Sequence, residues 1–385
     1  MPLRFLTAGE SHGPAVVAIL EGLPAGLPLA PADLNPDLAR RQGLSASGKP
    51  YPGASPRMKL ERDTAVILGG VMAGVTIGAP VALEVQNRDH AKWKGKAVAP
   101  MTVPRPGHAD LTGAVKYAHT DLRMSLERAS ARETTARVAA GAICRKLLAE
   151  FGIRIGSYVI EIGGVRADLA EMALEDRISR ALEDEMACPD PAASAAMRER
   201  VEAVIRARDT LGGVFEVVAL GVPPGLGSHV HWDRRLSGRL AQAMLSIHAM
   251  KGVEIGEAFE NARKPGTQVQ DEIVLDDSRQ TTDDGDLSVV GRPSSLLRPT
   301  NLTPLRSVDL ASGEPAPVEY ERSDFCAVPR AGVIGEAMAA FVLADALLEK
   351  VGGDSLAEIR PRFAALRRAG LDDLRLSGAP TVFWP

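Results

Sequence analysis

Hydrophobic and polar positions change their period several times along the chain, which predicts a mixture of strands and helices. Residues 16–22 are almost wholly apolar and run into a Gly/Pro turn, the pattern of a strand. Residues 57–87 alternate apolar and polar positions around glycine turns, which predicts antiparallel strands, and residues 214–222 predict a further strand. Strands and helices do not alternate regularly, so the order does not favour a doubly wound parallel sheet.

Helices are predicted where the chain is rich in alanine or where apolar side chains recur at helical spacing. The segments with this pattern are 31–42, 131–152, 166–209 with a break at 188–191, and 337–348. Arg40 and Arg41 lie in the last turn of the first helix, and Gly152 ends the second, which is the clearest. The last segment is interrupted by Asp345 and is too short to span a bilayer, so it predicts a buried helix.

We expect one domain covering residues 1–385. Residues 16–28 and 214–227 both run from a strand into a Gly/Pro turn. This likeness is either an internal duplication, which would give the domain two pseudo-symmetric halves, or a chance similarity. The polar, Asp-rich residues 276–286 are the best candidate for a linker.

Composition narrows the class of protein. Hydrophobic residues make up 45% and charged residues 24% of 385 residues, as in a soluble globular protein. The net charge of −4 argues against nucleic acid as a partner. Three widely spaced cysteines offer neither a disulfide framework nor a zinc site, and the apolar run at the N-terminus is too short for a signal peptide. We expect a cytoplasmic protein with no membrane segment and no metal.

Two histidines lie in loops that suit catalysis. His12 follows Ser11 in GESHG, and His108 lies in RPRPGHAD, where prolines and glycine leave no room for a regular helix. Catalytic groups concentrate in such loops, although each histidine could instead cap a surface turn. His229 and His231 could hold a metal, but no carboxylate or cysteine cluster supports this, and a structural role is favoured.

Arginines give a second signal. Arg128 and Arg132 flank Ser130 where the long helix begins, and a helix N-terminus with forked donors suits phosphate or carboxylate. The alternative is that both arginines pair with Glu127 and Glu133 on a solvated face. More polar residues lie in or beside loops, namely Arg40, Arg41, Arg57, Arg105, Arg322 and Asp324. This set predicts a small anionic substrate and proton transfer. No Walker loop or GxGxxG follows a strand, so a P-loop or Rossmann site is not expected.

Several longer motifs resemble the chorismate synthase family and run in its order. They are FLTAGESHGPA near the N-terminus, RPGHAD (105–110), RASARETTARVAAGA (128–142), DTLGG (209–213), GLGS (225–228), HAMKGVEIGEAF (248–259) and the segment 321–355 beginning ERSDFCAVP. The resemblance implies an α+β fold, a β-α-β sandwich with helices enclosed between antiparallel sheets, in a homotetramer.

The resemblance also implies an activity. 5-Enolpyruvylshikimate 3-phosphate would lose phosphate and a ring proton in an anti-1,4-elimination, giving chorismate in the shikimate pathway of aromatic amino acid biosynthesis. Reduced FMN would be required without net redox change, supplied by a separate flavin reductase or by NADPH. One alternative is a non-catalytic homologue that binds flavin or an anionic metabolite. Another, a redox flavoprotein, is disfavoured because no Rossmann site is present.

Residue roles follow from the resemblance. His12 would protonate the leaving phosphate, Ser11 would support it, His108 would neutralise reduced flavin near N1, and Asp324 would help to remove the ring proton by way of flavin N5. Substrate anions would be held by Arg41, Arg105, Arg132 and Arg322. Flavin contacts would come from Arg41, Ser130, Ala131, Arg132, His248, Ala249, Arg292, Ser294, Ser295 and Arg322.

The chain departs from the family's pattern at four places. The family's RRxxGYGRGxRM is RRQGLSASGKPYPGASPRM here, which leaves Lys49 to replace an arginine. The family's NRAGGxxGG segment has no counterpart in residues 276–300, and its KPIST is RPSS at 292–295. Its AVPAAGV is AVPRAGV, which introduces Arg330. The second departure implies a rebuilt site, a weakened site or an altered sequence.

Overall fold

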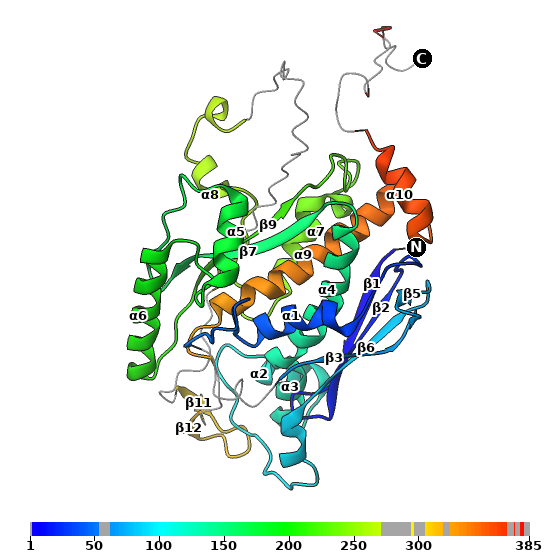
Figure 1. Ribbon diagram of the computed structural model, residues 1–385. Helices are drawn as coiled ribbons and strands as arrows, with labels where there is room; N and C mark the ends of the chain where they lie inside the picture. The colour runs from blue at the N-terminus through cyan, green and yellow to red at the C-terminus, as the bar shows by residue number, and fades with distance from the viewer. Residues whose placement is uncertain are drawn as a thin grey trace.

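In the described part of the chain, the computed structural model has two four-stranded antiparallel sheets with helices between them (Figure 1). It describes residues 2–53, 62–270, 294–295, 305–318, 324–367, 373 and 378–380. The predicted linker, 276–286, lies outside the described residues.

The first sheet is built from the N-terminal quarter of the chain. Its strands, in spatial order, are β1 (Arg4–Ala8), β2 (Ala15–Glu21), β6 (Val81–Gln86) and β3 (Ala65–Gly69). A short hairpin, β4 (Val71–Met72) and β5 (Val75–Thr76), connects the last two. Ala18 and Leu20 of β2 are buried while Ile19 between them is 42% exposed, so one face of this sheet packs on the core.

The second sheet comes from the middle of the chain. Its order is β10 (Ser294–Ser295), β9 (Gly213–Leu220), β7 (Arg154–Ile162) and β8 (Val165–Arg166). A separate hairpin pairs β11 (Arg306–Val308) with β12 (Pro315–Pro317). The two strand–turn segments that look alike in sequence, β2 and β9, are both inner strands, one in each sheet.

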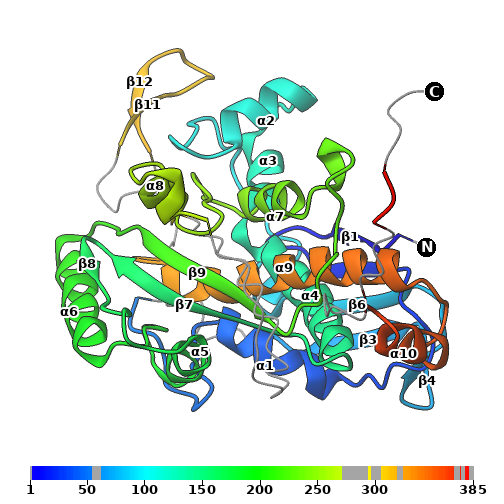
Figure 2. The same ribbon diagram turned by 90° about the horizontal axis from the view of Figure 1, so that it is seen from above.

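Three helices fill the space between the sheets (Figures 1 and 2). They are α1 (Pro31–Arg41), α4 (Thr134–Ala149) and α9 (Val328–Val351), with α4 against the first sheet and α9 against the second. Helices α4 and α9 cross at Gly141, where an added Cβ would lie 2.3 Å from the Cβ of Ala337. Only small residues permit so close a crossing, which explains the alanine-rich sequence of α4.

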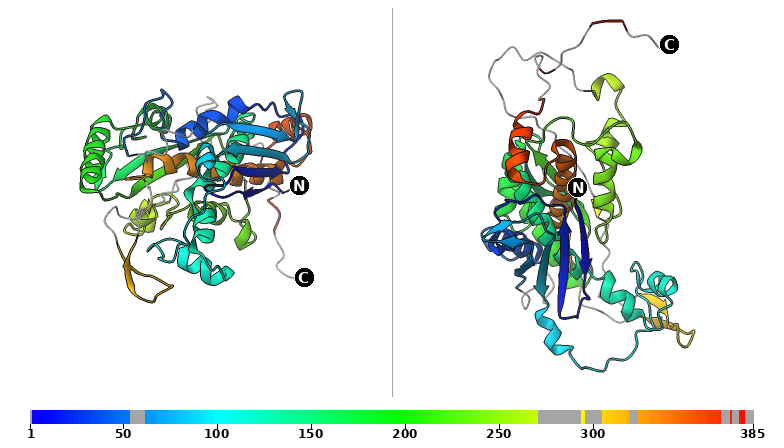
Figure 3. Two further views of the ribbon diagram at one scale, coloured as in Figure 1. Left: turned by 90° about the horizontal axis from the view of Figure 1, so that it is seen from below. Right: turned by 90° about the vertical axis from the view of Figure 1, so that its right-hand side faces the viewer.

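The other helices cover the sandwich or project from it (Figure 3). The α-helices among them are α2 (Asp110–Tyr117), α3 (Leu122–Ala129), α5 (Leu174–Glu183), α6 (Pro191–Ala207), α7 (Leu236–Leu245), α8 (Ala258–Asn261) and α10 (Leu356–Ala364). The 3₁₀ turns are η2 (Arg88–Lys92), η3 (Ala131–Glu133), η4 (Trp232–Arg234) and η5 (Gly266–Gln268).

A buried ion cluster ties the central helices together. The Glu336 carboxylate on α9 has no exposed surface and accepts hydrogen bonds from Arg40 at 2.6 and 2.7 Å and from the Ser157 hydroxyl at 2.6 Å. Arg145 of α4 lies 3.1 Å from the same carboxylate. By length and composition α9 could cross a membrane, but 83% of its apolar stretch is buried inside the protein, where it forms the core.

The predicted α+β sandwich is confirmed. Residues 131–152 start with the 3₁₀ turn η3 before α4, and the predicted helix 337–348 is part of the longer α9, which begins at Val328. Strand β7, whose residues are buried from Ile155 to Ile160, was not predicted from the sequence.

Candidate active site

The GESHG loop connects β1 to β2 and has a fixed backbone. Gly9 has a φ of +105°, and a Cβ there would lie 2.4 Å from the carbonyl oxygen of Ala15. Glycine alone fits that position. The amide of Asn87, at the end of β6, donates to the carbonyl oxygens of Glu10 at 3.1 Å and Gly13 at 2.8 Å. The loop is therefore held from both sides of Ser11 and His12.

Glu127 of α3 is the main partner of His12. Its carboxylate lies 2.7 Å from His12 Nδ1 and accepts the backbone N–H of His12 at 2.8 Å. The backbone carbonyl of Glu127 also accepts the N–H of Ser11 at 3.0 Å. Burial raises the pKa of Glu127, but hydrogen bonds from His12 and the charges of His12 and Arg123 outweigh it and hold the pKa below its usual value. The carboxylate therefore stays ionised and fixes the orientation of the imidazole.

Aromatic packing closes the other side of His12. The rings of His12 and Trp93 are 4.3 Å apart at their centroids. His90 of η2 bonds through Nδ1 to the carbonyl of His12 at 2.9 Å. The imidazole keeps 19% of its surface exposed, so it can meet a ligand from one side.

Ser11 and Ser130 form a hydroxyl pair. Their Oγ atoms lie 3.1 Å apart, and Ser11 is only 2% exposed. Ser130 also caps η3 by accepting the N–H of Arg132 at 3.3 Å. This pair joins the GESHG loop to the point where the long helix begins.

Arg41 and Arg132 meet at one carboxylate. Arg132 donates to Asp63 at 2.7 and 2.9 Å, and Arg41 reaches the same carboxylate at 3.4 Å. Arg41 also donates to Thr134 Oγ1 at 2.8 Å and to the carbonyl of Ala131 at 2.7 Å. All three charged groups are at least 95% buried. Two guanidinium groups therefore meet at one buried carboxylate.

His248 follows α7 and lies beside the first turns of α4. Its Nδ1 is buried and has no partner among the described residues. Burial lowers the pKa of His248; the Glu133 carboxylate opposes the shift, while Arg137, Arg41 and Arg128 add to it. Ala249 adopts a left-handed φ of +65°. A neutral imidazole with an unbonded buried nitrogen is a group prepared for a ligand.

Asp324 lies four residues before the start of α9 and forms an ion pair with Arg330 of that helix. Arg330 donates in turn to the carbonyl of Arg41 at 3.3 Å. The structure thus links Asp324 to the cluster that contains Arg41.

Arg105 and His108 belong to a second cluster. Arg105 donates to both oxygens of Asp110, at 2.8 and 2.9 Å. His108 bonds through Nδ1 to the carbonyl of Pro106 at 3.1 Å. This turn contacts the β11–β12 hairpin, because Ser307 donates to Pro104 at 2.7 Å.

Some predicted residues cannot be placed. Arg57, Arg292 and Arg322 lie outside the described residues, and of Ser294 and Ser295 the structure gives only the backbone, as strand β10. Lys49 is exposed, in a turn where Ala46 bonds to Leu182 of the end of α5 at 2.8 Å.

Four residues of the site were not predicted from the sequence. Asp63, Asn87 and Trp93 carry no local pattern that sets them apart: Asp63 precedes β3, Asn87 follows β6, and Trp93 ends the turn η2. Glu127 was considered only as an ion partner for the arginines; instead it holds His12. The local sequence around Glu127 does not indicate this role, because its partner His12 lies in the GESHG loop, far away in the sequence.

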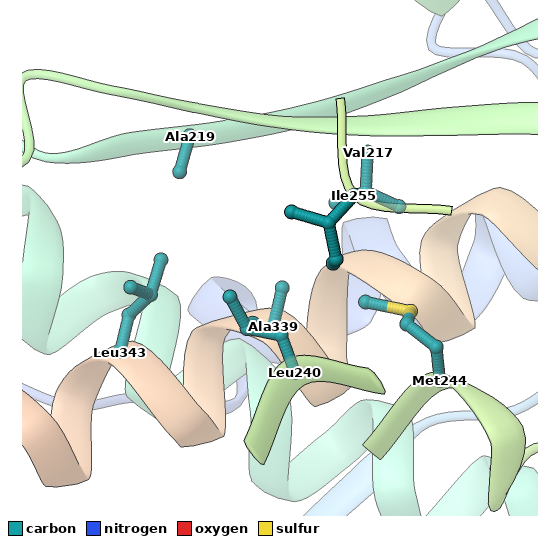
Figure 4. A pocket seen from close by; sticks show the side chains of 7 residues that line it. All are labelled: Val217, Ala219, Leu240, Met244, Ile255, Ala339 and Leu343. Atoms are coloured by element: carbon teal, nitrogen blue, oxygen red, sulfur yellow. The ribbon is translucent and has the colours of Figure 1, made fainter. Parts of the chain in front are cut away.

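The structure also has a pocket whose lining side chains are all apolar, with no ionisable or hydroxyl group (Figure 4). It is lined by Val217, Ala219, Leu240, Met244, Ile255, Ala339 and Leu343. Among the described residues no group of histidine, cysteine, aspartate and glutamate side chains could hold a metal ion.

Comparisons with known proteins agree with one another. A family model described as chorismate synthase matches residues 3–348. Curated relatives of that name are 49% identical in Aquifex aeolicus, over 94% of this chain and 96% of theirs, and 50% identical in Rubrobacter xylanophilus, over 96% and 98%. A solved structure described as "Crystal Structure of Chorismate Synthase" superposes with a TM-score of 0.73 at 42% identity, covering 94% of this chain and 97% of the other.

Proposed function

The chain belongs to the chorismate synthase family of shikimate-pathway lyases, and we propose that it converts 5-enolpyruvylshikimate 3-phosphate to chorismate at the site around His12. The observation that carries this proposal is the His12–Glu127 pair, held beside Ser11 and Ser130 next to the Arg41–Arg132 cluster. The non-catalytic alternative is not favoured, because well-covered relatives near 50% identity all carry the enzyme's name.

The substrate's anionic groups are drawn to the arginine cluster. Arg41 and Arg132 bring two guanidinium groups together in a buried place, where screening by salt is weak. By resemblance, Arg105 and Arg322 complete the set that holds phosphate and carboxylates.

His12 acts as the acid that protonates the leaving phosphate. Glu127 engages Nδ1, so Nε2 is the nitrogen assigned to the phosphate oxygen. The neighbouring carboxylate stabilises the positive charge on the imidazole before transfer. Ser11, joined to Ser130, supports the same oxygen through its hydroxyl. Protonation makes phosphate a better leaving group as the C–O bond breaks.

Reduced FMN is the cofactor we propose, and the residues present fit it. The buried Nδ1 of His248 has no partner in the described part of the chain, and a flavin atom would satisfy it. Ser130 and Ala131, at the start of η3, supply backbone and hydroxyl groups, and Arg41 and Arg132 balance negative charge. When bound, reduced FMN lends electron density while the C–O bond breaks.

Two further assignments complete the proposed chemistry. His108 offsets the negative charge of the reduced cofactor, and the Asp324 carboxylate is the final acceptor of the ring proton. Arg292, Ser294, Ser295 and Ala249 are proposed cofactor contacts by resemblance.

We also propose a cytoplasmic homotetramer that takes reduced FMN from a separate reductase or through NADPH. The outward face of the first sheet supports association, since it exposes large apolar side chains: Leu6, Ile19, Val66 and Leu68. The described cysteines are free and buried, which suits a reducing compartment.

Anaerobic phosphate release tests the function. Purified protein is mixed with 5-enolpyruvylshikimate 3-phosphate and chemically reduced FMN, and phosphate is compared with chorismate absorbance. Equal amounts of both products, without consumption of reductant, are expected. Substrate and FMN that bind without any phosphate release would contradict the proposal.

A further inference from the structure

Arg330 lies in the first turn of α9 and is only 8% exposed. Its Nη2 forms an ion pair with Asp324, and its Nη1 donates to the backbone carbonyl of Arg41 at 3.3 Å. The Asp324 side chain is itself only 13% exposed. One guanidinium therefore connects the segment that carries Asp324 to helix α1.

The backbone next to Asp324 is fixed by its own hydrogen bonds. The N–H of Phe325 donates to the carbonyl of Gly53 at 3.2 Å, and the carbonyl of Phe325 accepts the N–H of Leu211 at 2.8 Å. The hydroxyl of Tyr51 donates to the carbonyl of Cys326 at 2.8 Å. With the backbone held, the direction of the Asp324 carboxylate depends on the groups that bind it.

Arg330 remains a cation in this position. Burial lowers its pKa to about 10 and the charge of Arg41 adds to the shift, while Tyr51 opposes it. A buried guanidinium is costly without an opposite charge, and Asp324 supplies that charge. The Nε atom of Arg330 is buried and has no hydrogen-bond partner among the residues that the structure describes, so the bonds to Asp324 and Arg41 come from Nη2 and Nη1.

Other ionisable groups around the pair do not titrate near neutral pH or are already paired. Burial raises the pKa of Cys326 to about 11 and that of Tyr51 well above its usual value. Asp184 and Glu185 line a surface pocket together with Arg330. Asp184 accepts the Ser194 hydroxyl at 2.9 Å, and Glu185 pairs with Arg198.

We propose that Arg330 is a positioning residue for the elimination, which keeps the Asp324 carboxylate ionised and aimed from the Arg41 side of the site. This inference rests on the role of Asp324 in the proposed function. In the overall reaction a ring C–H bond breaks and its proton ends on Asp324, while the ring's electron pair forms the new double bond and phosphate leaves with the C–O pair. A protonated or misdirected carboxylate cannot accept that proton.

The test compares Arg330→Met with Arg330→Lys, using kcat and KM over pH 5–9 with reduced FMN under anaerobic conditions. For Arg330→Met we expect kcat to fall by about tenfold to a hundredfold, because the acceptor is misplaced. The acid limb of the kcat–pH profile should move to higher pH by about one unit or more, because the positive charge next to the Asp324 carboxylate has been removed. Arg330→Lys should keep the acid limb of the parent protein.

Two controls separate this role from a structural one. Arg177→Met removes another partly buried arginine, which donates to the carbonyl groups of Met172 and Leu169, and should leave the pH profile unchanged. The double variant Arg330→Met with Asp324→Asn should be no slower than Asp324→Asn alone. Additive losses, or an unshifted acid limb in Arg330→Met, would overturn the inference.

The outcomes also distinguish this inference from the proposed function. Full activity of Asp324→Asn would remove Asp324 from the proposed chemistry and the inference with it. Inactive Asp324→Asn together with a normal Arg330→Met would overturn only the role of Arg330. If Arg330→Met does not fold, Arg330→Lys decides, since an acid limb raised by about one unit there contradicts charge-based positioning.

Discussion

His12 Nδ1 lies 2.7 Å from a carboxylate oxygen of Glu127, a residue 115 positions later in the chain. The same carboxylate accepts the backbone N–H of His12 at 2.8 Å, so side chain and backbone are fixed together. This pairing supports the proposed role of His12 as the acid of the site.

Removing either member of this pair should slow turnover. His12→Ala should lower kcat by about 10²–10⁴-fold, the usual contribution of a general acid. Glu127→Gln keeps the shape but removes the charge, so we expect a smaller loss in kcat with little change in KM. Glu10→Gln is the matched control, because Glu10 is exposed on the same loop. Near-normal kcat for His12→Ala would exclude it as the acid.

Asp63 forms ion pairs with two buried arginines, Arg41 and Arg132, and its replacement should leave their positive charge without this partner. Asp63→Asn should lower the free energy of unfolding by about 3–5 kcal/mol, the cost of breaking a buried ion pair. Inorganic phosphate should stabilise this variant more than the parent protein, since the anion replaces the missing charge. Urea unfolding with and without phosphate measures both effects. Equal stabilisation of the two proteins would show that the Arg41–Arg132 cluster does not attract anions.

Much of the fold could be predicted from local patterns. The limits of β2, α1 and β9 agree with residues 16–22, 31–42 and 214–222 within two residues, because strand alternation and helix-end signals are local. The strand β7 was missed because both its faces are buried, so it shows no alternation.

The candidate site was predictable only in part. Ser11, His12 and Ser130 could be predicted, because a glycine-flanked loop and the start of a helix can both be recognised from the local sequence. Glu127 and Asp63 did not, because their roles depend on partners that are 115 and 69 residues away in sequence. Only the folded chain brings residues so far apart in sequence into contact, and no local sequence pattern predicts such a contact.

Glu336 should make the free energy of unfolding decrease as the pH becomes acidic. Burial raises its pKa, but the charges of Arg40 and Arg145 and the hydrogen bonds from Arg40 and Ser157 outweigh it, so the folded-state pKa lies below the unfolded value. Its contribution to stability is therefore present above the unfolded pKa and is lost as pH falls. Glu336→Gln should cost about 3–5 kcal/mol at pH 7 and less at pH 4. Chemical denaturation at both pH values checks this.

Glu349→Gln is the control for that measurement. Glu349 pairs with Arg234 and Arg239 but is 41% exposed, so its loss should cost less than about 1 kcal/mol. A cost for Glu336→Gln as small as this would mean that the buried cluster does not stabilise the fold.

The apolar outer face of the first sheet should control assembly. Leu68→Lys, at a position 58% exposed on β3, should shift the protein towards smaller species by placing a charge in a buried contact. Light scattering after size exclusion gives the mass. Val230→Lys, 75% exposed on a different surface, is the control and should leave the mass unchanged. A monomeric parent protein, or an unchanged mass for Leu68→Lys, would rule out this face as the interface.

His248 should make stability depend on pH and should contribute to flavin binding. Burial lowers its pKa in the folded protein, with Arg137, Arg41 and Arg128 reinforcing the shift against Glu133. Below the ordinary histidine pKa of about 6.5 the unfolded chain takes up a proton that the folded protein resists, so the fold loses stability as pH falls. His248→Leu removes this penalty, and its stability relative to the parent protein should rise as the pH falls from 7 to 5. The same variant should bind reduced FMN more weakly at pH 7, because the buried Nδ1 is lost. Equal FMN affinity, measured anaerobically by fluorescence, would show that His248 is a packing residue only.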